Sequence, residues 1–152
     1  MVLSKRFSIV AAVVGLIGAF VAPASAQTAE EIVARARTAM VGVVERTQGA
    51  AREIADSTCA RIKELDANGA SADELRRAAR EGLDRLRGAG ERGRQGVNEI
   101  ARNAGAALKE INADRRFFRA VREAADRSHN GIGDATRHAA RAIERCLREA
   151  LK

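Results

Sequence analysis

Apolar residues recur every eleven positions along the segment from residue 28 to residue 65. The steps between them are four, four and three residues, repeated three times, which corresponds to about 3.67 residues per helical turn. Such a stripe stays on one side of a nearly straight α-helix, which other helices must cover. It consists of Ile32, Ala36, Met40, Val43, Thr47, Ala51, Ile54, Thr58, Ile62 and Leu65. Since strand-like alternation is absent elsewhere, the sequence predicts an all-α fold, either an antiparallel helical bundle or an extended helical hairpin.

Capping motifs and turn residues divide the chain into helices. Thr28 with Glu31 and Ser71 with Glu74 have the spacing of capping boxes. Asn68-Gly69 is a strong turn signal between them. The predicted helices span residues 28–66, 72–87, 96–112, 114–129 and 134–151, with Asp134 as the N-cap of the last one.

The segment 88–96 carries four glycines in nine residues, and we expect it to interrupt the helical structure. Four glycines cost a helix roughly 4 kcal/mol relative to alanine. The alternative is one continuous helix whose glycines admit a closely packed neighbour, because the apolar phase continues through the segment. A break also brings Cys146 back to the level of Cys59 more easily than one long helix would.

The N-terminus has the organisation of a secretory signal peptide. Lys5 and Arg6 precede an uncharged apolar stretch, and Ala24-Ser25-Ala26 follows Pro23. Cleavage is expected between Ala26 and Gln27, which leaves residues 27–152 as a single helical domain without a transmembrane segment. The expected location is secreted or periplasmic. The alternative is an uncleaved membrane anchor, since the apolar run is almost long enough to span a bilayer.

The exported part has few residues from which to build a core. Only 23 of its residues are Ile, Leu, Val, Met or Phe, and it contains neither Trp nor Tyr. Two cysteines in an exported chain favour one disulfide, Cys59 to Cys146, although intermolecular bridges and buried free thiols remain alternatives. The bridge would stabilise so thin a core by roughly 4 kcal/mol.

The residue types that carry chemistry are scattered. His129 and His138 lack carboxylates or cysteines at metal-ligand spacing. No serine stands in a nucleophile elbow. The order of Met40 and His138 resembles that of axial ligands in periplasmic four-helix cytochromes, but covalent haem attachment has no motif here. We therefore expect no enzymatic activity, no catalytic residue, no metal ligand and no cofactor, and keep a small periplasmic haem or metal carrier as a second alternative.

The sharpest local feature is an arginine cluster on one predicted helix, Arg115, Arg116, Arg119 and Arg122. Because residues 1–26 hold two of the 27 bases and none of the 20 acids, the exported part has a net charge of +5. The sequence favours an exported, non-enzymatic structural, scaffolding or envelope-associated protein-binding module that meets an unknown protein partner or a second copy of itself. The alternative is a membrane-surface or polyanion binder, in which the cluster grips lipopolysaccharide, anionic lipid or extracellular nucleic acid. No specific nucleic-acid motif is present.

Overall fold

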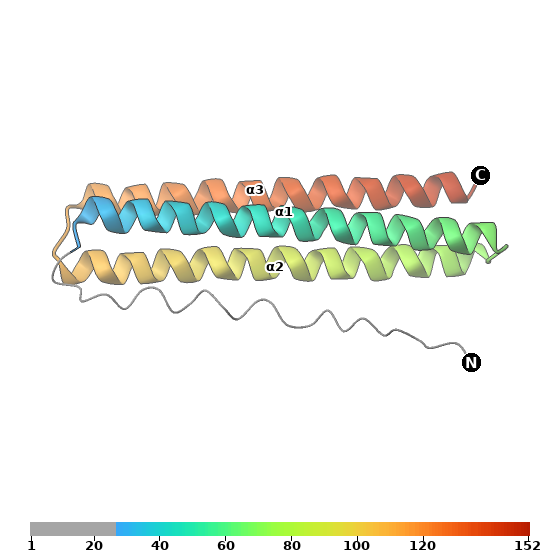
Figure 1. Ribbon diagram of the computed structural model, residues 1–152, viewed down its shortest axis with the longest axis horizontal. Helices are drawn as coiled ribbons and strands as arrows, with labels where there is room; N and C mark the ends of the chain where they lie inside the picture. Colours follow the sequence, from blue (N-terminus) through green and yellow to red (C-terminus); the bar gives the residue numbers. More distant parts are fainter. Residues whose placement is uncertain (1–26) are drawn as a thin grey trace, which may run out of the picture.

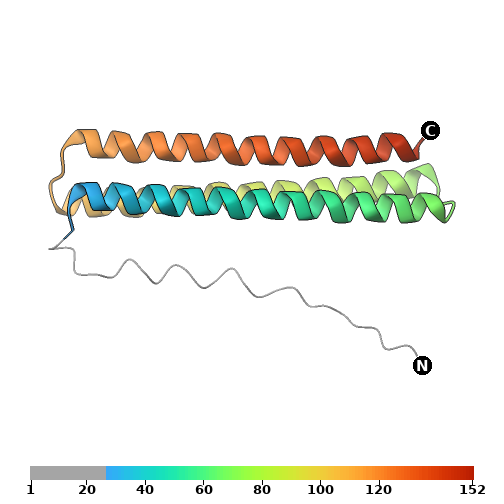
Figure 2. The same cartoon turned by 45° about the horizontal axis from the view of Figure 1, so that its top comes forward.

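The computed structural model describes residues 27–152, which form three long helices and no strand (Figure 1). Helix α1 spans Ala29–Ala67, α2 spans Ala72–Glu110 and α3 spans Arg115–Ala150. Figures 1 and 2 show α2 running antiparallel to α1 and α3, and each helix packs against the other two. The all-α prediction is confirmed, and of the two predicted arrangements the helices form the bundle. The expected signal peptide, residues 1–26, and its cleavage site lie outside the described residues or at their boundary.

The ends of α1 and the start of α2 are where the sequence predicts them. The Thr28 hydroxyl accepts a hydrogen bond from the backbone N–H of Glu31, whose carboxylate accepts one from the Thr28 N–H, both at 3.2 Å. After α1, Gly69 adopts a φ of +73°, and the N–H of Ala70 reaches the carbonyl of Leu65 at 3.0 Å. This is the Schellman ending, in which a left-handed residue satisfies the last carbonyls of a helix.

The predicted break at 88–96 is wrong, because α2 continues through all four glycines. Gly90 and Gly93 are buried against the other helices. A Cβ atom on Gly93 would lie 2.6 Å from the Thr47 hydroxyl and 3.2 Å from Cδ1 of Ile132, and one on Gly90 would lie 3.0 Å from Thr136. The glycines therefore allow three helices to approach closely, which offsets their low helix propensity.

The predicted break between residues 129 and 134 is also wrong, because α3 continues through it. Gly131 faces α1, where its Cβ would lie 3.1 Å from a methyl group of Val44, and Gly133 is buried. Asp134 is therefore not an N-cap, and it pairs instead with Arg137 one turn later. The cap of this helix is Asp114, whose carboxylate accepts a hydrogen bond from the Arg116 N–H at 2.8 Å.

Two apolar clusters fill the interior, one toward each end of the bundle. The first joins the start of α1, the end of α2 and the start of α3, and its largest fully buried members are Ile32, Met40, Val97, Leu108 and Ile132. The second joins the opposite ends around Ile62, Leu75, Leu86 and Ile143. Between them lies a region, here called the waist, where Gly93 faces Thr47 and Gly90 faces Thr136.

Cys59 on α1 and Cys146 on α3 lie at disulfide distance, with their Cα atoms 5.6 Å apart. The predicted pairing of these two positions is thus confirmed in the geometry. The expectation that a continuous α2 would hinder it is wrong. Helix α3 is also continuous and runs parallel to α1, so each cysteine lies about 45 Å along its own helix.

Candidate functional site

A shallow groove of about 560 Å³ lies between α2 and α3, beside the first apolar cluster. Its apolar floor is formed by residues of both helices. Gly105 on α2 contributes no side chain, and a Cβ atom there would meet nothing within 4 Å. Phe118 on α3 lies at the edge of the floor and is 37% exposed. The floor consists of Ala101, Gly105, Phe118, Val121 and Ala125.

Four arginines surround this floor: Arg102 from α2, and Arg115, Arg119 and Arg122 from α3. All four side chains belong to exposed residues. Within residues 27–152, none of them has a carboxylate oxygen within 4 Å. Their charges are therefore available to an anion that approaches from solvent. We call the floor and its four arginines the arginine groove.

The predicted arginine cluster divides in the structure. Arg115, Arg119 and Arg122 come together at the groove, as their helical spacing indicates. Arg116 faces away from it, with its guanidinium 3.9 Å from Glu30 of α1 and 4.7 Å from the centre of the Phe117 ring. Arg102 is the residue that sequence reasoning missed. It belongs to another helix, and no local spacing relates it to the cluster.

The two histidines lie at different places on α3. Nε2 of His129 is 3.0 Å from the Asn98 side-chain oxygen on α2, which ties the two helices together. His138 is exposed and lines a second hollow, between α1 and α3, together with Arg52 and Asp56. Met40 is fully buried in the first cluster. Helical rise puts it about 18 Å from the level of Arg52 and His138, so the two candidate axial ligands are not brought together.

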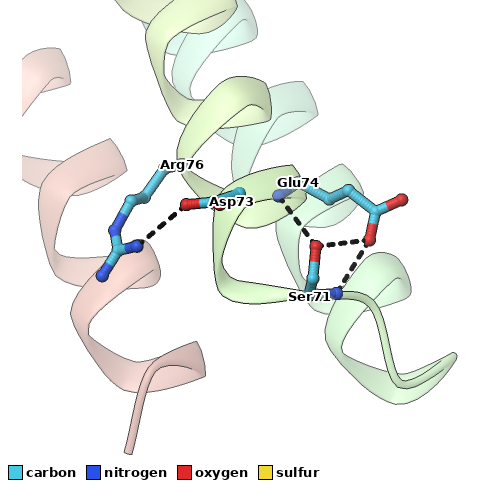
Figure 3. Close-up of polar contacts among 4 residues, drawn as sticks. All are labelled: Ser71, Asp73, Glu74 and Arg76. Atoms are coloured by element: carbon cyan, nitrogen blue, oxygen red, sulfur yellow. Dashed lines mark hydrogen bonds and ion pairs between the residues drawn. The ribbon is translucent and has the colours of Figure 1, made fainter.

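The serines serve the backbone of the helices. The hydroxyl groups of Ser57 and Ser128 donate to carbonyls one turn earlier, at 3.1 and 2.9 Å. Ser71 begins α2, where its hydroxyl and its N–H both donate to the Glu74 carboxylate at 2.8 Å (Figure 3). The hydrogen bond from the Ser71 hydroxyl, followed by that from its backbone, lowers the pKa of Glu74 below the ordinary glutamate value. Each of the three serine hydroxyl groups therefore has a hydrogen-bond partner within or at the start of its own helix.

In residues 27–152, no three His, Cys, Asp or Glu side chains are grouped so that they could hold a metal ion. Over the same range, every helix is too polar or too short in its apolar stretches to cross a bilayer. Comparison of the chain with protein-family models, curated proteins and solved structures gives no match. The arginine groove is therefore a candidate functional site because of its geometry alone.

Proposed function

We propose that the protein is an exported, non-enzymatic helical module of the cell envelope that attaches to anionic membrane surfaces through the arginine groove. The observation that carries this proposal is the convergence of four arginines, free of carboxylate partners within residues 27–152, around an apolar floor. Guanidinium groups bind phosphate oxygens in a forked geometry. Each basic residue near an anionic bilayer contributes about 1 kcal/mol to attachment.

Export is supported by the signal-peptide pattern of the sequence and by the cysteine pair at disulfide distance, since disulfides persist in oxidising compartments. A protein-binding scaffold, the function that the sequence alone favours, would use the same rigid bundle. The groove favours a membrane surface because its charges have one sign and surround exposed apolar atoms. Headgroup phosphates and the outer part of the acyl layer offer the complementary chemistry.

The proposal is tested by co-sedimentation of the oxidised protein, purified from the export compartment of an expressing host, with lipid vesicles. We expect binding to vesicles that contain phosphatidylglycerol, weak binding to pure phosphatidylcholine, and a decrease as salt rises from about 50 to 500 mM because the interaction is screened. The triple variant Arg115→Gln/Arg119→Gln/Arg122→Gln should lose at least ten-fold in affinity.

The matched control removes the same charge from the other end of the bundle, in the variant Arg80→Gln/Arg141→Gln/Arg145→Gln. These arginines are also exposed. Equal losses in the two triple variants would show that net charge alone acts, and would overturn the assignment of the groove. Tighter binding to a short DNA duplex than to the anionic vesicles would overturn the choice of a membrane surface.

A further inference from the structure

We propose that the arginine groove holds one anionic amphiphile at a time, with its acyl chain on the apolar floor and its anionic headgroup between the arginines. This inference rests on the proposed function and specifies its ligand. Attachment to a flat anionic surface does not require that the apolar floor be hollowed between α2 and α3, and the hollow is what the single-lipid site would use.

The floor is open at Gly105, whereas several other glycines of α2 are in close contact with a neighbouring helix. At Gly82, Gly90 and Gly93 an added Cβ would lie 3.0 Å or less from a threonine of another helix. At Gly105 it would meet nothing, although α3 runs beside α2 at this level. The missing side chain leaves a trough that Phe118 borders. The groove has a volume of about 560 Å³ and is open to solvent.

The arrangement of charge selects among occupants. Arg102 stands on the α2 side, and Arg115, Arg119 and Arg122 stand on the α3 side. An acidic headgroup can therefore be gripped from both helices while a chain lies on the floor. A free phosphate would leave the partly exposed Phe118 uncovered, and a zwitterionic lipid would bring a cation toward four guanidinium groups. An anionic lipid with one apolar chain satisfies both parts of the groove.

Isothermal titration calorimetry of the oxidised protein with lysophosphatidylglycerol, kept below its critical micelle concentration, tests this proposal. We expect one molecule bound per chain, and at least ten-fold weaker binding of both glycerol phosphate and lysophosphatidylcholine. Equal binding of glycerol phosphate would overturn the acyl-chain part of the proposal. Binding of many molecules per chain would overturn the discrete site. An acidic amphipathic peptide that binds more tightly than the lipid would overturn the choice of ligand.

The variant Gly105→Leu fills the trough without changing any charge. It should weaken binding of the single lipid at least ten-fold. Gly49→Leu is the matched control, because a Cβ at Gly49 on α1 also meets nothing within 4 Å. This control should bind the single lipid normally, and circular dichroism melting is used to check that both variants fold.

Different results would overturn the single-lipid site and the attachment to membranes. If Gly105→Leu binds the single lipid as tightly as the unmodified protein does, only the single-lipid site is overturned. Vesicle attachment that does not depend on Arg115, Arg119 and Arg122 would overturn the proposed function, whatever the lipid titration shows.

Discussion

A side chain on Gly93 would clash with Thr47 on α1 and crowd Ile132 on α3. Its Cβ atom would lie 2.6 Å from the hydroxyl oxygen of Thr47 on α1 and 3.2 Å from Cδ1 of Ile132 on α3. The β-branched Thr47 cannot swing away easily, because its hydroxyl donates to the Val43 carbonyl at 2.8 Å. The absent side chain therefore sets how closely the three helices meet at the waist.

We predict that Gly93→Ala destabilises the protein by about 1–3 kcal/mol, the usual cost of overpacking, despite a gain in helix propensity. Gly49→Ala should stabilise it by up to about 1 kcal/mol, since its surroundings are open. Urea unfolding followed by circular dichroism measures both changes. Adding Thr47→Ala to Gly93→Ala should restore part of the loss. A stabilising Gly93→Ala would contradict the close contact.

The capping box of α2 predicts how the stability of the protein changes at low pH. Because the pKa of Glu74 is lowered by Ser71 in the folded protein, the ionised carboxylate contributes stability that is fully present above its unfolded-state pKa. This contribution is lost as the pH falls through the lower, folded-state pKa. Ser71→Ala should therefore reduce the melting temperature at pH 7 and make a smaller difference near pH 3. A difference that stays constant with pH would contradict the linkage.

The helices show what sequence patterns do and do not determine. Helix α1 was predicted at residues 28–66 and spans Ala29–Ala67, because its start, its end and its apolar stripe are all local signals. The interruptions predicted in α2 and α3 were wrong. The low helix propensity of glycine is also a local signal. The contacts that offset it are not local, because they come from Thr47, Thr136 and Val44 on other helices. Arg102 could not be predicted for the same reason, because it reaches the groove from α2. The arginines of α3 could be predicted, because their spacing along one helix is a local signal.

Continuity of α2 predicts slow hydrogen exchange across residues 88–96. In a helix the amides of this segment are hydrogen-bonded, and Gly90 and Gly93 are buried between helices. We expect exchange of these amides within about ten-fold of that of the neighbouring turns in α2, measured by NMR or by mass spectrometry of short peptides. Rapid exchange confined to residues 88–96 would contradict a continuous α2 and support the break that the glycine content suggests.

Residues 27–152 form a rod whose two ends differ. Helices of 36 to 39 residues make it about 58 Å long. The first apolar cluster lies beside the arginine groove, and the second contains the Cys59–Cys146 pair at its edge. Because each cluster is rich in alanine, we expect a Cys59–Cys146 bridge, which would join α1 to α3 at one end, to supply a large share of the stability.

Removing the link should lower the free energy of unfolding by about 4–5 kcal/mol, the loop-closure value for cysteines 87 residues apart. The variant Cys59→Ala/Cys146→Ala, compared with the oxidised protein in urea, measures this loss, and a non-reducing mass spectrum shows the bridge in the starting material. Below its lowered melting temperature, the variant should still attach to anionic vesicles, because the groove lies at the other end of the rod. Equal stability of the two forms, or two free thiols in the exported protein, would contradict the role of the bridge.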